Sequence, residues 1–153
     1  MKTINKMRLS FESRSANEAF ARGAVASFAS ILDPTATEIA DIKTAVSEAV
    51  TNSIVHGYDD EIKMIYITSF IKEDNTLIIK IKDTGKGIED IKTAMTPLFT
   101  TSPNDERAGL GFAVMESMMD KVKVISKKDK GTTVTLTKKI LSKNNTISAS
   151  DGD

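Results

Sequence analysis

The sequence predicts a two-layer α/β fold in which helices cover one face of a mixed, mostly antiparallel sheet. Two observations support this expectation. Strand-like segments in the middle of the chain and toward its C-terminal end come in pairs joined by short turns, as in hairpins, and segments with helical periodicity separate them. The resulting order is strand, two helices, hairpin, lid, helix and hairpin, which is typical of a sheet with its helices on one side.

A first strand is expected at residues 7–11, where apolar and polar residues alternate. Ser15 stands three residues before Glu18, which is the spacing of a capping box. A helix is therefore predicted from about residue 16 to residue 32. Apolar residues at every fourth position are expected to form its core-facing stripe: Phe20, Ala24, Phe28 and Leu32.

The spacing of Thr35 and Glu38 repeats the capping box and predicts a second helix that ends near residues 56–57. Residues 62–71 are apolar on both faces and suggest a central strand, followed by a turn and a returning strand at 77–82.

A short helix is expected to follow as far as residue 94, and then a long loop, interpreted as a lid, at residues 95–108. The next helix is predicted at 109–119, and two strands at 121–127 and 132–140 complete the fold. Residues 1–140 are expected to form one domain, and the polar segment 141–153 a disordered tail.

Composition excludes several classes of function. The chain of 153 residues has no cysteine and a single histidine, His56, which excludes disulfides, thiolate metal sites and multi-histidine metal centres. Its 21 basic and 21 acidic residues give zero formal net charge, so no attraction to nucleic acid or anionic membranes is expected. No apolar run is long enough to span a membrane and no signal region is visible, which predicts a cytoplasmic protein.

Glu48 and Asn52 lie four residues apart and share one face of the second helix. A carboxylate in such a position can accept a proton, and an amide oxygen beside it can bind Mg²⁺. The alternative is an ordinary solvated helix face.

Asp83 ends a predicted strand and is followed by Gly85 and Gly87. A carboxylate there can accept a hydrogen bond from an exocyclic amine, while the glycines allow close approach of a ligand. The alternative is a simple turn leaving the strand. The glycine spacings of dinucleotide-binding and phosphate-binding loops are absent.

Gly109, Leu110 and Gly111 are expected to open a helix whose N-terminal N–H groups can bind an anion. Arg107, just before them, can reach a terminal phosphate through its planar guanidinium group. A loop hinge and a surface arginine are the alternatives.

Taken together, these motifs resemble the ATP-binding superfamily of gyrase, heat-shock chaperones, histidine kinases and mismatch-repair ATPases. The similar segments are SEAVTNSIVHGY at 47–58, DTGKGI at 83–88, RAGLGF at 107–112 and GTT at 131–133. Further segments, FESRSANEAFAR, PLFTTSP and ERAGLGF among them, resemble the anti-sigma F family of serine-protein kinases in spore-forming bacteria. The resemblance spans about residues 7–140.

The resemblance implies a Bergerat-type ATP-binding fold, with Glu48 as general base, Asn52 as Mg²⁺ ligand and Asp83 as acceptor for the adenine amine. It implies sigma-factor contacts by Glu18 and Arg22. The implied nucleotide-binding residues are Asn52, Asp83, Gly85, Gly87, Ile88, Thr100, Thr101, Arg107, Gly109, Leu110, Gly111 and Thr132.

The implied activity is inhibition of a sporulation sigma factor, together with ATP-dependent phosphorylation of a serine on an anti-anti-sigma protein. The implied state is a homodimer that uses ATP or ADP with Mg²⁺ and binds neither nucleic acid nor membrane directly. Two alternatives stay open: a stress-response anti-sigma serine kinase, and a catalytically silent, nucleotide-gated module that binds sigma. A sensor histidine kinase is disfavoured, because the only histidine lies within the nucleotide-binding helix.

Overall fold

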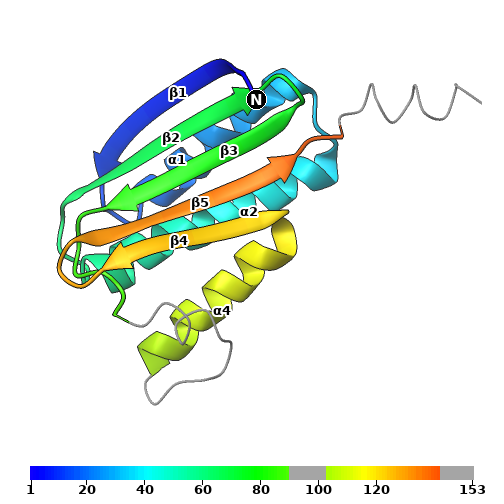
Figure 1. The fold of residues 1–153 in the computed structure, drawn as a ribbon. Coiled ribbons are helices and arrows are strands. Elements are labelled where there is room, and N and C mark those ends of the chain that lie inside the picture. Colours follow the sequence, from blue (N-terminus) through cyan, green and yellow to red (C-terminus); the bar gives the residue numbers. More distant parts are fainter. Residues whose placement is uncertain (90–102, 142–153) are drawn as a thin grey trace, which may run out of the picture.

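The computed structural model describes residues 1–89 and 103–141, and only the backbone of residues 103–109. Five strands form one sheet in the order β1-β2-β3-β5-β4 (Figure 1). Every pairing is antiparallel, so this sheet has no parallel component among its described strands. The strands are β1 (Thr3–Glu12), β2 (Met64–Lys72), β3 (Thr76–Asp83), β4 (Lys121–Lys127) and β5 (Gly131–Lys139).

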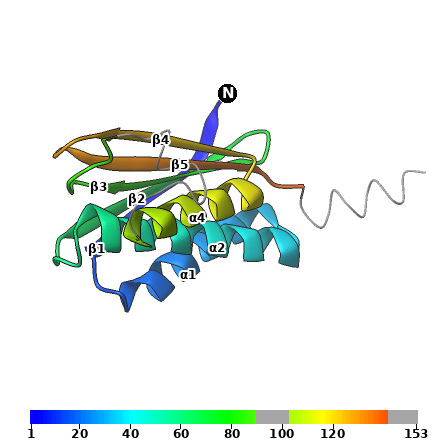
Figure 2. The ribbon, with the colours of Figure 1, turned by 90° about the horizontal axis from the view of Figure 1, so that it is seen from below.

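The helices lie on one face of the sheet, as Figure 2 shows, which confirms the predicted two-layer arrangement. They are α1 (Asn17–Ala29), the 3₁₀ turn η1 (Ser30–Leu32), α2 (Ala36–Asn52), the π-helical turn η2 (Ser53–Gly57) and α4 (Pro103–Met118). Helix α2 packs against both α1 and α4 and so forms the centre of the helical layer. Among the described residues, no helix combines the length and apolar character that crossing a membrane requires.

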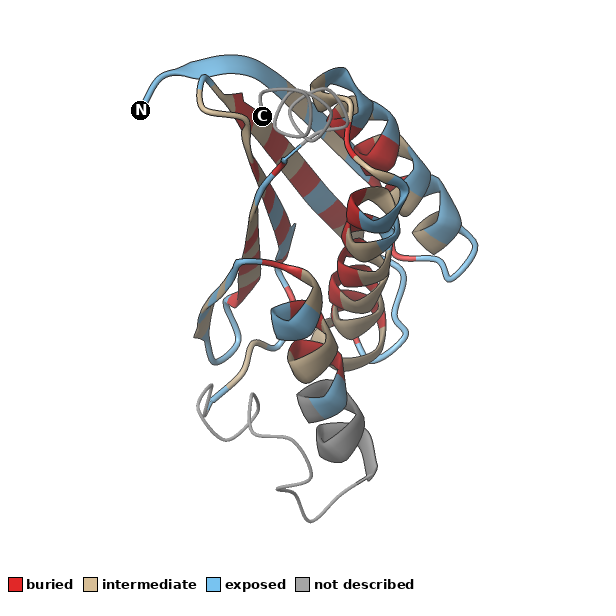
Figure 3. Cartoon of the chain, turned by 90° about the vertical axis from the view of Figure 1, so that its right-hand side faces the viewer, coloured by how far each residue is buried: buried red, intermediate tan, exposed pale blue. Residues whose placement is uncertain are grey.

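The core lies between the two layers, where buried residues alternate along the strands (Figure 3). Ile65, Ile67 and Ile71 of β2 face the helices and are at most 1% exposed. The strand is central, as expected, because it pairs with both β1 and β3, but only one of its faces is buried: Tyr66 points the other way and is 43% exposed. The pleat places alternate residues on opposite faces, and only one face is covered by described helices.

One of the two predicted capping boxes is confirmed. The Thr35 hydroxyl accepts from the Glu38 N–H over 3.1 Å, and the Glu38 carboxylate accepts from the Thr35 N–H over 2.9 Å. The box expected at Ser15 and Glu18 is wrong. Helix α1 begins after Ala16 without a side-chain cap, because the Glu18 carboxylate binds Arg22 instead.

The buried stripe of α1 is one residue away from the predicted one. Ala21, Val25 and Ala29 are fully buried, whereas Phe20 is 57% exposed and contacts the ring of Phe11 edge-on at 6.3 Å. Small side chains on the buried face allow α1 to lie close to the neighbouring helix, so the large Phe20 ring is displaced to the rim. The prediction is therefore confirmed in part: Phe28 and Leu32 of the predicted stripe pack against the core, whereas Phe20 does not.

Helix α4 begins at Pro103, six residues before the predicted start. Residues 103–108 are therefore helical rather than part of the expected loop. A proline at the first position followed by Asp105 and Glu106 is a typical helix start, because these residues suit the free N–H groups there. The expected short helix to residue 94 and the remainder of the expected lid lie outside the described residues, as does most of the expected tail.

Ser69 provides a test of this core. Its hydroxyl is fully buried and has no hydrogen-bond partner among the described residues. Because an unsatisfied buried hydroxyl costs free energy, we expect Ser69→Ala to raise the free energy of unfolding by about 1 kcal/mol in urea titrations.

The matched control is Ser13→Ala. The Ser13 hydroxyl donates to the Glu61 carbonyl and accepts from the Lys63 N–H, both over 2.9 Å. This change should lower the free energy of unfolding by about 1 kcal/mol. A loss of stability in Ser69→Ala would mean that its hydroxyl is satisfied in solution.

Candidate nucleotide site

The last two turns of α2 place Glu48 and Asn52 against Gly111 of α4. A methyl group at position 111 would lie 3.2 Å from Glu48 Oε2 and 3.3 Å from both terminal atoms of the Asn52 amide. A side chain at 111 would therefore crowd both polar groups, which would have to shift slightly to make room. The structure thus brings together three of the predicted site residues from two helices.

Asn52 has a buried amide nitrogen with no hydrogen-bond partner among the described residues. Buried amides are normally satisfied, so an unpaired one beside a carboxylate indicates that a ligand completes the site. No group of three or more acidic or histidine side chains capable of holding a metal occurs in the described part of the chain. The residues present fit Mg²⁺ as one or two oxygen ligands, with phosphate oxygens and water supplying the rest.

Asp83 is a buried carboxylate at the end of β3, only 3% exposed. The Ser53 hydroxyl donates to its Oδ2 over 2.8 Å, and the Gly85 N–H donates to its Oδ1 over 3.0 Å. Burial raises the pKa of the Asp83 carboxyl above its usual 3.8, although these hydrogen bonds oppose the shift. The hydrogen bonds thus fix the orientation of the Asp83 carboxylate, while its burial disfavours the charged form.

The π-helical turn η2 brings the chain back against this carboxylate. A methyl group at Gly57 would lie 2.9 Å from Asp83 Oδ2, and one at Gly85 would lie only 2.1 Å from the Gly57 carbonyl oxygen. Both positions therefore require glycine for steric reasons. Wider turns of this kind recur at functional sites because they displace the residues that follow.

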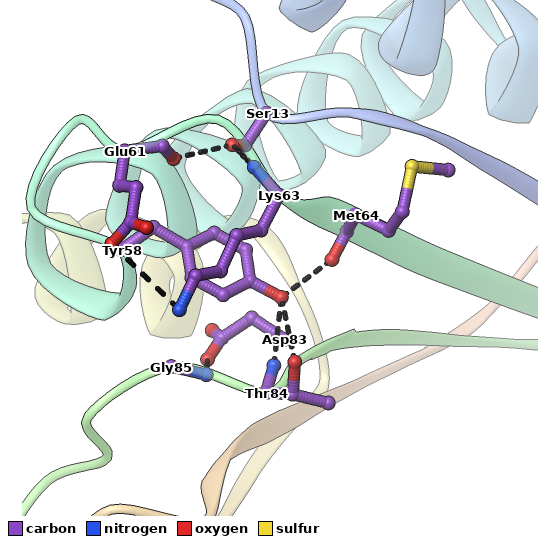
Figure 4. A network of polar contacts seen from close by, with 8 residues as sticks. All are labelled: Ser13, Tyr58, Glu61, Lys63, Met64, Asp83, Thr84 and Gly85. Atoms are coloured by element: carbon purple, nitrogen blue, oxygen red, sulfur yellow. Dashed lines mark hydrogen bonds and ion pairs between the residues drawn. The ribbon is translucent and has the colours of Figure 1, made fainter.

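Tyr58, directly after η2, connects three segments through its hydroxyl group (Figure 4). The hydroxyl accepts from the Thr84 N–H over 2.8 Å and donates to the Met64 carbonyl over 2.5 Å. The ring is buried, and Lys63 Nζ lies 5.8 Å from its centre. Tyr58 thereby fixes the backbone immediately after Asp83.

The segment that follows Asp83 packs against the turn between β4 and β5. Gly87 has a φ of +75°, and a methyl group there would lie 1.9 Å from the Lys127 carbonyl oxygen. The Ile88 N–H donates to the Ser126 hydroxyl over 2.7 Å, and that hydroxyl lies 2.7 Å from the Thr132 hydroxyl. Close contacts with protein backbone thus explain why glycine occupies positions 85 and 87. That a nucleotide also comes close to these glycines stays a prediction.

The other predicted site residues are placed less completely. Thr100 and Thr101 lie outside the described residues, and so does the side chain of Arg107. Gly109 and Leu110 lie within α4 rather than at its start, so the expected anion site at a helix N-terminus is wrong for these residues. Backbone N–H groups in the body of a helix are already bonded to carbonyls of the preceding turn.

Glu18 and Arg22 form a pair on α1, on the far side of α2 from α4 (Figure 1). Arg22 Nη1 lies 2.8 Å from each carboxylate oxygen of Glu18. The Arg22 side chain is 41% exposed, and its contact with a sigma factor stays a prediction.

Sequence reasoning missed the groups that hold Asp83 in place. Ser53, Gly57 and Tyr58 fall within the quoted segment 47–58, but nothing in their spacing predicted hydrogen bonds or contacts with residues 83–85. A serine directly after Asn52 carries no signal of a partner thirty residues later.

Residues 11–138 match the family model described as the histidine kinase-like ATPase domain. The chain is 57% identical over 140 residues to the anti-sigma F factor of a Thermoanaerobacter species, covering 92% of this chain and 97% of that protein. It is 56% identical to the anti-sigma F factor of Clostridium acetobutylicum, covering 88% and 94%. The chain therefore belongs to the anti-sigma F factor family of histidine kinase-like ATPase domains.

Solved structures share the fold at low sequence identity. The RsbU and RsbW domains of a Mycobacterium tuberculosis protein match with a TM-score of 0.62 at 17% identity, over 89% of this chain and 32% of that one. The histidine kinase domain of a blue-light activated kinase from Erythrobacter litoralis matches with a TM-score of 0.52, also at 17% identity, over 80% and 61%. These likenesses concern the fold alone.

Asp83→Asn tests the raised pKa. Above pH 3.8 the unfolded carboxyl loses its proton while the folded one keeps it to a higher pH, so stability falls as pH rises through that window. Because asparagine carries no charge to desolvate, we expect the variant to be more stable than wild type at pH 7 and to lack this fall.

The same variant should bind ADP more weakly, by about 1.5–3 kcal/mol in calorimetry, because a hydrogen bond to a charged acceptor is lost. Ser30→Ala, which removes a hydroxyl in η1 that donates to the Ala26 carbonyl over 2.9 Å, is the control and should leave ADP affinity unchanged. Equal ADP affinity in Asp83→Asn and wild type would remove Asp83 from the adenine site.

Proposed function

We propose that this chain is an ATP-dependent protein-serine kinase that also inhibits a sporulation sigma factor. Its phosphoacceptor is a serine of an anti-anti-sigma protein, and it acts as a homodimer in the cytoplasm. The observation that carries the kinase proposal is the meeting of Glu48 and Asn52 against Gly111, with Asp83 fixed at the end of β3. The names of the relatives support the anti-sigma activity.

Asp83 is suited to orient the adenine ring. Its oxygens accept from the Ser53 hydroxyl and the Gly85 N–H, and the Thr132 backbone is a third donor. A carboxylate offers about four acceptor sites, so one further donor can still be bound. An exocyclic amine is a donor that such a carboxylate can recognise. This contact would fix the base, and the ribose and phosphates would then extend toward Asn52 and α4.

Asn52 and Glu48 are suited to the phosphate end of the site. The Asn52 amide oxygen would hold Mg²⁺, which when bound neutralises charge on the phosphate oxygens. Glu48 would accept the proton of the incoming serine hydroxyl as the serine oxygen bonds to the γ-phosphorus and the bond to ADP breaks. The Glu48 carboxylate lies against Gly111, and none of the ion pairs between described residues involves it.

The anti-sigma activity requires a surface separate from this chemistry. Arg22 lies on α1, which α2 separates from α4, and part of its guanidinium group is exposed. We assign Glu18 and Arg22 to the sigma contact, with Glu18 holding the guanidinium in place for an acidic group of the partner.

The direct test is a transfer assay. The protein is mixed with γ-labelled ATP, Mg²⁺ and a candidate anti-anti-sigma protein, and the product is analysed for phosphoserine. Labelled phosphoserine on the partner supports the proposal. Nucleotide binding without transfer would instead favour the catalytically silent, nucleotide-gated module.

Glu48→Gln should bind ATP as wild type does but transfer phosphate about 10²–10⁴-fold more slowly, because the base is lost. Glu116→Gln, which removes an exposed carboxylate from α4, is the matched control and should be fully active. Transfer at the normal rate by Glu48→Gln would require another base.

Arg22→Ala should weaken sigma capture by about 2–5 kcal/mol, mainly through faster dissociation, because a charge contact is lost. Folding should be little affected, since a pair spaced four residues apart on a helix contributes only about 0.3–0.5 kcal/mol. Dissociation is measured from an immobilised sigma factor, with Arg8→Ala as the control on the opposite face of the sheet. Identical dissociation of Arg22→Ala and wild type would place the sigma contact elsewhere.

A further inference from the structure

The sheet face that points away from the helices is strongly basic. Strand residues whose side chains point to this side alternate with the buried ones, and nine of them are cations. The only acidic residue among the strand residues of this side is Glu12, which pairs with Arg14 at 3.0 Å. We call the following set the basic sheet face: Lys6, Arg8, Lys72, Lys80, Lys82, Lys121, Lys123, Lys127 and Lys139.

The strand register places these cations in a regular array. Arg8, Thr68, Lys80, Thr135 and Lys123 face one another in turn across all five strands. Neighbouring strands are about 4.8 Å apart, so cations on alternate strands lie roughly 10 Å apart with threonine hydroxyls between them. The array offers both positive charge and hydroxyl donors.

None of these nine cations takes part in a close ion pair among the described residues, although Lys139 attracts the Asp74 carboxylate electrostatically. The five ion pairs between described residues all use other cations. Three of the lysines surround the ring of Phe70 instead, with Lys6 Nζ 5.2 Å and both Lys72 Nζ and Lys80 Nζ 5.8 Å from its centre. Cation–π attraction holds their ammonium groups together without cancelling their charge.

We propose that the basic sheet face binds single-stranded nucleic acid through its phosphate backbone. Lysine is depleted from the cores of protein–protein interfaces but is a principal contact to phosphates, so a lysine-rich face fits a nucleic acid better than a protein. A second copy of the chain would present the same positive charge. The proposal is independent of the kinase and anti-sigma proposals.

The shape of the face favours a single strand over a duplex. No described helix lies on this side of the sheet to enter a major groove (Figure 2). Tyr66, which is 43% exposed between Ser10 and Lys82, offers an aromatic face on which an unstacked base can lie. The zero net charge of the whole chain gave no indication of this surface, because the fold gathers cations on one face.

Fluorescence anisotropy of labelled oligothymidylate and oligouridylate of about 20 nucleotides tests the proposal on the full chain. We expect binding whose affinity falls steeply between about 50 and 200 mM salt. Lys80→Glu should reduce the affinity on the order of tenfold, and Tyr66→Ala should reduce it with little change in salt dependence. Lys43→Glu, the same charge change on the exposed side of α2, should alter it less than about twofold.

Several results would overturn the proposal. One is the absence of binding at the lower salt concentration, and another is an equal effect of Lys80→Glu and Lys43→Glu. Displacement of the oligonucleotide by polyglutamate of matched charge would point to an acidic protein segment instead. If Lys80→Glu changed the sedimentation of the protein but not its affinity for the oligonucleotide, the basic sheet face would instead be the contact between two copies of the chain. Thermal unfolding of each variant confirms that the comparison is between folded proteins.

Discussion

The burial of the Asp83 carboxylate is the constraint on which the rest of the site depends. A charged group at 3% exposure is tolerated only because the Ser53 hydroxyl and the Gly85 N–H bind it. Those donors reach it only if η2 and the segment after β3 come very close together. This is why Gly57 and Gly85 cannot carry side chains, and why Tyr58 bonds to the backbone of Thr84. The buried Asp83 carboxylate thus constrains the path of both η2 and the segment after β3.

Helix α2 connects this arrangement to the part of the candidate site that holds Glu48 and Asn52. Its buried side faces the sheet, with Ile42, Val46 and Val50 fully enclosed, while its last turns carry Glu48 and Asn52 toward α4. The two faces of α2 therefore have different roles. The apolar face packs in the core, and the polar face lies against Gly111. Because the core fixes the rotation of α2, the separation of the two site residues from Asp83 is fixed as well.

The periodicity of the sequence predicted most of the helices and strands, but sequence patterns predicted only part of the candidate site. Alternation located the strands, and the Thr35–Glu38 box located the start of α2. The centre of the buried face of α1 was misplaced by one residue, because Phe20 and Ala21 both fit a four-residue repeat and only packing against α2 favours the smaller residue. Glu48, Asn52 and Asp83 were recognisable from their spacing and order. Ser53 and Tyr58 were not, because their partners at Asp83 and Thr84 are distant in sequence.

The Glu38 carboxylate forms hydrogen bonds with both the start of α2 and the segment after β5. One carboxylate oxygen completes the cap of α2, and the other accepts from the Leu141 N–H over 2.7 Å, where the described chain ends. Glu38 and Asn52 are fourteen residues apart on a helix that rises about 1.5 Å per residue, so roughly 20 Å separates this exit point from the site. A fluorophore or affinity handle fused after residue 141 would therefore join the fold at the end of α2 remote from the candidate nucleotide site.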